Sequence, residues 1–297
     1  MQIIRPFDLN YADFTTTVPE TEAFAWASGT TYPAGAEVIR EHQVFVSTVA
    51  GNQGNDPLLE NQNFTDAKWI RKSATNAYKF IDKTIGSKTV SSSTVTITVS
   101  NVAGMRALML VGMRASTVRV QSRNSGAATV KDETVSLSGR NVSTFYQWFT
   151  EPLGEAATKI YLRDFPSDTD NIELTFVGSV IEIGELVIGD ILYVGKAMHE
   201  GTEGEVKSFT RWEFNAYGEL TRIPGPTRTI MRYQSHIPRS AFSNLKDQMD
   251  RLAGSIVGAV GSPDRQSTIQ VGILGTLRWS EDLPNDYLAN FVLDGVT

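Results

Sequence analysis

The stretch that decides the fold reads TVSSSTVTITV over residues 89–99. Val95, Ile97 and Val99 alternate with threonines there, and a period of two carried by β-branched residues is typical of a half-buried strand. A turn follows, and the apolar run of residues 106–111 predicts a second, more fully buried strand. These two segments indicate a β-rich chain.

Further strands are predicted on either side of this pair. The alternation of Val118 and Val120 with polar residues predicts one, and the remainder are expected at residues 158–163, 172–176 and 187–194. Short strands separated by turns about every 8–12 residues are typical of a sandwich or barrel. We therefore expect a mainly β chain with a β-sandwich in its middle.

One segment, residues 240–257, has a helical period instead. Its apolar residues recur at spacings of three and four, at Phe242, Leu245, Met249, Leu252 and Ile256. This spacing predicts one amphipathic helix, with Ser240 as its N-cap and Gly258 as its stop. We expect the apolar stripe to pack in the core or against a neighbouring subunit.

The composition excludes several classes of site. The 297 residues contain 27 Lys and Arg against 33 Asp and Glu, for a net charge of −6, and no cysteine. A scattered, outnumbered set of basic residues argues against a nucleic-acid partner, and the lack of cysteine excludes disulfides and thiolate zinc sites. Residues 1–10 show no signal-peptide pattern, and the longest apolar run is far shorter than the ~20 residues of a membrane span. We therefore expect synthesis in a reducing cytoplasm and no membrane insertion.

The candidate domain boundaries of the chain lie at residues 71–76 and 198–207. They divide it into a small β module over residues 1–72, a β-sandwich over residues 75–200 and a mixed α and β region over residues 201–297. The first unit is rich in aromatic residues and glycines, in the order Trp26, Tyr32, Gly35, Val38, Val44, Phe45, Pro57 and Trp69. Since each aromatic side chain buries roughly 150–250 Å², Trp26, Tyr32 and Trp69 are expected to build a core too small for aliphatic residues.

This segment resembles the chitin-binding-type carbohydrate-binding modules, small β modules attached to bacterial chitinases and cellulases. The resemblance covers residues 26–69 and rests on Trp26, Tyr32, Gly35, Val38, Phe45, Pro57, Ala67, Lys68 and Trp69. It makes Trp26, Tyr32 and Trp69 the candidate carbohydrate-binding residues. Glu37 stands where the modules have Asp. Ile70 stands where they have a second Trp, which is an exposed platform for a sugar ring, and an aliphatic side chain offers no π-face for that contact.

Modules of this type also occur in tail, collar and baseplate proteins of tailed bacteriophages, and the order of units in this chain is similar to that architecture. The resemblance implies a non-enzymatic virion structural protein that is made in the host cytoplasm. Its implied partners are other phage tail or neck proteins and further copies of itself, in a homo-oligomer. The alternative is a glycan-binding adhesin that contacts a host surface polysaccharide directly. A glycoside hydrolase is a third reading.

The residues that could carry chemistry do not form a recognisable pattern. The histidines are not at metal-ligand spacing; they are His42, His199 and His236. A glycosidase needs two carboxylates about 5–10 Å apart in a cleft; the pairs to consider are Glu182 with Glu185 and Asp164 with Asp168 or Asp170. No groove pattern flanks them. We therefore predict no catalytic residue, no metal site and no cofactor.

Overall fold

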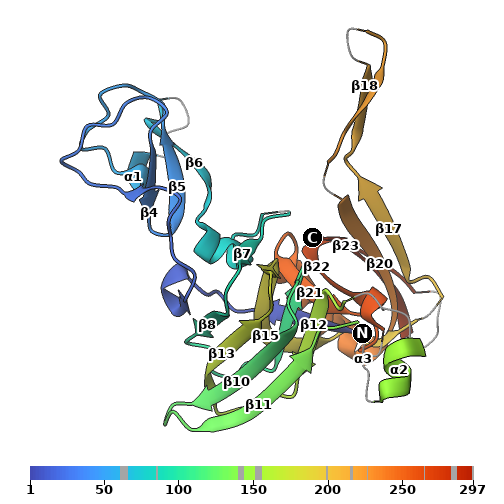
Figure 1. Ribbon diagram of the computed structural model, residues 1–297. Helices are drawn as coiled ribbons and strands as arrows, with labels where there is room; N and C mark the ends of the chain where they lie inside the picture. Colours follow the sequence, from blue (N-terminus) through green and yellow to red (C-terminus); the bar gives the residue numbers. More distant parts are fainter. Residues whose placement is uncertain are drawn as a thin grey trace.

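The structure is a computed structural model that describes residues 1–60, 66–84, 86–139, 144–150, 156–198, 200–214, 217–225, 227–263, 265–281 and 286–295. It is mainly β, with curled antiparallel sheets (Figure 1), as the strand periodicity predicts. In the part of the chain so described, no helix has the length and apolar character needed to cross a membrane.

The centre of the molecule is a sandwich of two sheet layers. One layer has the strand order β11 (Thr129–Ser136), β10 (Thr117–Asn124), β13 (Thr169–Val177), β8 (Val95–Val99) and β2 (Phe14–Thr16). The other contains β12 (Lys159–Arg163), β9 (Ala107–Val111) and β15 (Glu185–Tyr193). The largest core cluster joins the two layers and includes Val95, Ile97 and Val99 from the strand that the sequence marks most clearly.

The second layer continues into a much longer sheet. Beyond β15 its order is β1 (Gln2–Pro6), β21 (Ile256–Val260), β22 (Ile269–Ser280), β23 (Asp286–Gly295), β20 (Thr227–Pro238) and β16 (Lys196–Ala197). A separate short pair joins β7 (Thr89–Ser91) to β14 (Ile181–Ile183). The sandwich and the C-terminal region therefore share one sheet and are not divided near residue 200 as predicted.

Strand β1 is the link between these two regions, because it pairs with β15 on one side and β21 on the other. The backbones of β1 and β15 approach so closely that a Cβ on Gly189 would lie 1.8 Å from the carbonyl oxygen of Arg5. The predicted first unit is corrected accordingly. Residues 1–16 belong to the large sheets, and the small sheet of the module begins at Phe24.

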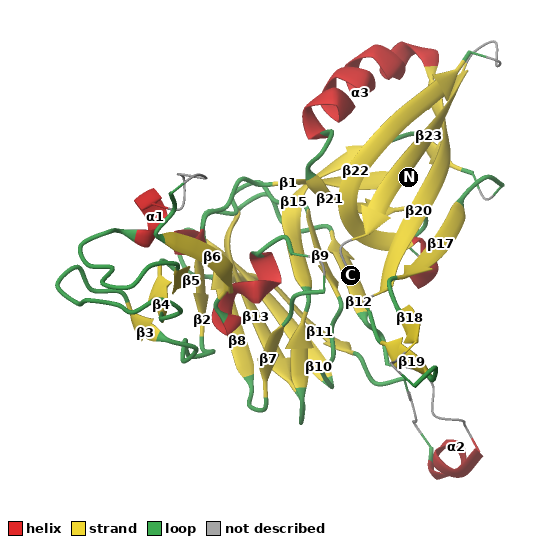
Figure 2. Ribbon diagram, turned by 90° about the horizontal axis from the view of Figure 1, so that it is seen from above, coloured by secondary structure: helices red, strands yellow, loops and turns green. Residues whose placement is uncertain are grey.

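Helix α3 (Arg239–Leu252) carries the predicted apolar stripe on a shorter helix than expected. Phe242, Leu245, Met249 and Leu252 are buried in a cluster with residues of β20, β22 and β23, so the stripe faces the protein's own core (Figure 2). The helix ends before the predicted Gly258, because Gly254 reverses the chain at φ +78° and Ile256 opens strand β21.

Three parts extend from this body (Figures 1 and 2). The module has β3 (Phe24–Ala25), β4 (Glu37–Arg40), β5 (Gln43–Ser47), α1 (Pro57–Glu60) and β6 (Trp69–Ala74). An extension on the other side has β17 (Glu203–Ser208), β18 (Arg211–Phe214) and β19 (Leu220–Ile223). The third part is the short helix α2 (Phe145–Thr150). The described residues also contain three short 3-10 helices: η1 (Tyr11–Asp13), η2 (Asn76–Ile81) and η3 (Gln266–Thr268).

Candidate functional sites: the aromatic module, its junction and the arm

The module is organised by a tight hairpin between β4 and β5. Arg40 pairs with Gln43, so the loop consists of Glu41 and His42 alone, at φ 45° and 63°. Positive φ at both central residues is the signature of a type I′ turn, whose twist matches that of the strands it joins. Strand β6 then pairs with β5, while β3 adds to β4 in parallel.

Trp69 is the centre of the module's core. Its side chain is 0% exposed and packs with Val38 and Phe45, and its Nε1 donates a hydrogen bond to the carbonyl oxygen of Asn55 at 2.9 Å. Burial of Trp69 in the core is therefore confirmed. The same burial leaves no ring face for a sugar, so the carbohydrate-binding role that the resemblance gives Trp69 does not fit the structure.

Trp26 and Tyr32 pack against this core and are half-buried. The Tyr32 ring meets the Trp69 ring edge-on with centroids 5.3 Å apart, and its hydroxyl accepts a hydrogen bond from the Ala27 backbone N–H at 2.8 Å. The guanidinium of Arg40 lies 5.3 Å from the centroid of Trp26. Both side chains thus brace the module, and each keeps part of its surface accessible.

Two exposed side chains complete the module's surface. Ile70 is 55% exposed, so it occupies an outward position on the module. Phe24 is 90% exposed, and sequence reasoning missed it as a surface aromatic. The signal available was its place two residues before Trp26, which does not reveal that the ring is exposed.

The junction between module and body is built around Glu20. Its Oε1 accepts hydrogen bonds from His42 Nδ1 at 2.9 Å and from the hydroxyl of Thr75 at 2.5 Å. The His42 ring also packs on Tyr78 of η2, with centroids 3.9 Å apart, and Glu22 accepts a hydrogen bond from the backbone N–H of Asn76. The chain before the module, its hairpin loop and the chain after it therefore meet at one point, which orients the module.

The carboxylates considered for glycoside hydrolysis have different surroundings. Glu182 pairs with Lys88 at 2.8 Å, and this hydrogen bond holds the pKa of its carboxyl below the usual range. Glu185 is buried, and loss of hydration, together with the nearby charge of Asp82, raises its pKa to about 8. Glu182 is thus held by an ion pair, while burial favours the protonated form of Glu185.

The remaining candidates lie on the surface or outside the described residues. Asp164 pairs with Arg163 at 3.4 Å, Asp168 is exposed, and Asp170 lies in β13. His236 lies 3.8 Å from Asp286, and His199 falls outside the described residues. Over the described ranges, no three His, Cys, Asp or Glu residues lie together as a metal site would require.

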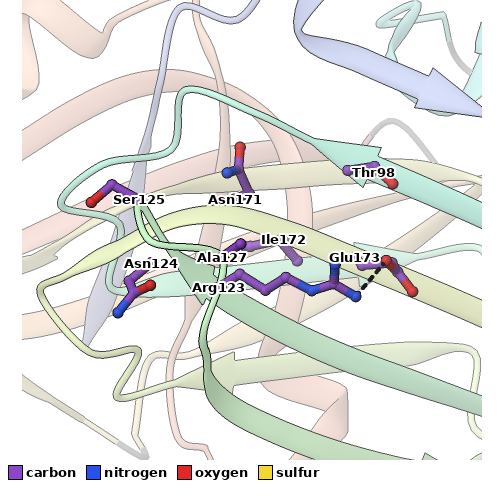
Figure 3. Close-up of a pocket in the computed structure, with 8 residues that line it drawn as sticks. All are labelled: Thr98, Arg123, Asn124, Ser125, Ala127, Asn171, Ile172 and Glu173. Atoms are coloured by element: carbon purple, nitrogen blue, oxygen red, sulfur yellow. Dashed lines mark hydrogen bonds and ion pairs between the residues drawn. The ribbon is translucent and has the colours of Figure 1, made fainter.

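A hollow of about 330 Å³ opens at one end of the β11-β10-β13-β8 layer (Figure 3). Arg123 and Glu173 point toward one another within it and form an ion pair at 3.0 Å. The other lining residues are Thr98, Asn124, Ser125, Ala127, Asn171 and Ile172. Its hydroxyl and amide groups can hydrogen-bond a small polar molecule.

The arm, defined as residues 209–225 with strands β18 and β19, is an amphipathic ribbon. Trp212 pairs with Arg222 and Phe214 pairs with Leu220, so these four side chains share one face. Arg211, Glu213, Thr221 and Ile223 share the other face. Trp212, Phe214 and Leu220 are 60%, 75% and 55% exposed, so the described part of the chain leaves the apolar face largely uncovered.

Helix α2 presents a second uncovered apolar surface. Phe145, Tyr146 and Phe149 are all strongly exposed, and the rings of Phe145 and Phe149 contact one another edge-on at 5.1 Å. Sequence reasoning missed both α2 and the arm. Aromatic-rich stretches are visible at both places, but they do not reveal that the side chains are exposed.

Comparison with known proteins adds no assignment, since no protein-family model matches this chain and no curated protein matches it.

Proposed function

We propose that this chain is a non-enzymatic structural protein of a tailed-phage virion, in the tail tip, baseplate or collar. There it holds neighbouring subunits and positions host-recognition parts. The observation that carries the proposal is the arm, whose apolar face extends into solvent with Trp212 and Phe214 largely exposed. Contiguous exposed apolar surface on a projecting element marks a site of protein association.

The module gives the second support. It projects from the body on the side away from the arm (Figure 1), and the contacts of Glu20 with His42 and Thr75 fix its direction. A rigidly directed small module on a subunit that also carries an association arm is suited to a particle whose parts are held in fixed positions. The resemblance of residues 26–69 to modules found in phage tail proteins supplies the assignment to a virion.

The proposal is tested on particles. Virions from a host that produces this chain are purified on a density gradient, and peptides of the chain are quantified against those of the major capsid protein. We expect a fixed stoichiometric number of copies that corresponds to a symmetric ring, and a cryo-electron microscopy reconstruction should place those copies in the tail or neck. Absence of the chain from purified virions would refute the proposal.

A direct glycan-binding role is the second candidate, and the exposed ring of Phe24 favours it. An aromatic face open to solvent can stack on a pyranose, and Trp26 lies two residues away on the same module. A glycan array with the full chain tests this role. Binding that is lost in Phe24→Ser and retained in Phe145→Ser, which removes another strongly exposed aromatic on α2, would favour the adhesin.

A further inference from the structure

We infer that the apolar face of the arm docks on helix α2 of a second copy of this chain, so that subunits associate head to tail. The inference rests on the proposed structural function and names the partner of the arm. The arm and α2 are each too small to be stable alone. A two-stranded ribbon is marginal in water, and a helix of six residues is far below the length that is stable in isolation.

The positions of the two surfaces argue for a second copy. The arm and α2 extend from the same side of the body but lie far apart along it, the arm at the top and α2 at the bottom of Figure 1, so within one chain their apolar surfaces do not cover each other. An arm-to-arm contact between two copies would still leave Phe145, Tyr146 and Phe149 in water. A contact between the arm of one copy and α2 of the next covers both surfaces at once, and repetition of such a heterologous contact closes a ring.

The two surfaces also share their chemistry, since each exposes at least three large apolar side chains. Three aromatic side chains on α2 offer roughly 450–750 Å² at about 150–250 Å² each, and the arm offers Trp212, Phe214 and Leu220 from one face. A standard interface buries about 800 Å² per partner, so a single contact of this size buries less than a standard interface. We therefore expect weak association of two copies that becomes stable when a ring is complete.

The base of the arm is built to hold its direction. A Cβ on Gly225 would lie 2.3 Å from the carbonyl oxygen of Phe209. The two backbone segments of the arm therefore pass close to one another where the arm leaves β17 and β20. Thr210 bridges the same point, since its hydroxyl accepts a hydrogen bond from the Gly225 N–H at 3.4 Å. A directed arm loses less entropy on docking than a flexible one.

The chain contains no cysteine, so single-cysteine variants give an unambiguous test. Leu220→Cys on the apolar face of the arm is mixed with Tyr146→Cys on α2, each with a different mass tag, under mild oxidation. Thr221→Cys, the adjacent residue on the opposite face, replaces Leu220→Cys in the control. We expect a mixed disulfide dimer, formed about tenfold faster than in the control if docking favours that geometry by about 1.4 kcal/mol.

Sedimentation velocity supplies an independent readout that keeps every native aromatic on α2. Trp212→Asp should weaken self-association about tenfold or more, as loss of a central aromatic contact does, while Thr221→Asp should leave it unchanged. Mixed dimers no faster than the control, or a faster Leu220→Cys homodimer, would overturn the head-to-tail contact. Detection of the chain in virions would leave the proposed function standing in that case. Cross-linking together with absence from virions would refute only the function.

Discussion

The side chains of Trp69 and Ile70 lie on opposite faces of strand β6, the indole fully buried and the isoleucine 55% exposed. Adjacent residues of a strand alternate between faces, so the two positions report on different properties of the module. Trp69 reports on its stability, and Ile70 on its capacity to contact a ligand.

Trp69→Ala should therefore destabilise the module. Removal of a buried Trp side chain leaves a cavity and an unpaired carbonyl at Asn55, and such truncations cost about 3–5 kcal/mol. The full chain is followed in urea by intrinsic fluorescence and circular dichroism. Phe24→Ala is the matched control, since loss of an exposed aromatic in the same module should change stability by less than about 0.5 kcal/mol. Equal midpoints for the two variants would contradict the core assignment.

Ile70→Trp should create or strengthen binding of chitooligosaccharides without unfolding the module. The substitution places an exposed aromatic face at the position where the chitin-binding-type modules that this segment resembles have their platform, and an outward side chain can enlarge without crowding the core. Isothermal titration with chitohexaose measures the gain, and Ile70→Leu controls for a change of shape without a π-face. Strong binding already present in the unmodified chain would show that the platform is not missing.

Glu185 should make stability depend on pH. Burial raises the pKa of this carboxyl to about 8 in the folded chain, against 4.5 as its ordinary value, so the folded state binds more protons between these two pH values. The stability contribution is complete below pH 4.5 and is lost as the pH rises to about 8. Glu185→Gln should flatten this fall, as measured by urea unfolding at several pH values. Glu182→Gln, whose carboxyl has a lowered pKa, should not flatten it.

Gly189→Ala should displace strand β1 from the large sheet. The added Cβ would lie 1.8 Å from the carbonyl oxygen of Arg5, and neither backbone can move without loss of pairing. We expect destabilisation of several kcal/mol and rapid proteolysis within residues 1–16. Gly29→Ala is the control, because an added Cβ there meets nothing within 4 Å. Equal protease resistance of the two variants would show that β1 tolerates the change.

The parts of the fold that could be predicted from sequence are those with a local cause. Val95, Ile97 and Val99 alternate with polar residues, and the structure buries these three in the sandwich core. The position of β1 has no such cause, because its five residues pair with strands far away in the chain. The predicted C-terminal end of α3 is wrong for the same reason. Ile256 continues the helical spacing of apolar residues, but it pairs with Ile273 in a sheet.

The features of the candidate sites likewise divide into those that could be predicted from sequence and those that could not. The burial of Trp69 follows from the size of a small module, whose core needs aromatic residues. The exposure of Phe24, Trp212 and Phe214 does not follow from the sequence, since an alternating apolar pattern predicts one covered face without naming what covers it. An exposed apolar face therefore has the same sequence pattern as a face that packs in the core.

The position of β1 also sets an order of events during synthesis. Its neighbours β15 and β21 emerge from the ribosome long after it, and at about 5–20 residues per second the interval to β21 is on the order of tens of seconds. The strands of the module pair locally over residues 24–74 and can close early in that interval. Ile3 and Ile4, which are fully buried in the finished protein, have no strand to pair with until β15 emerges, and β21 completes their pairing later. The nascent chain thus carries a folded module beside an open apolar strand, which is a natural point of engagement for a chaperone.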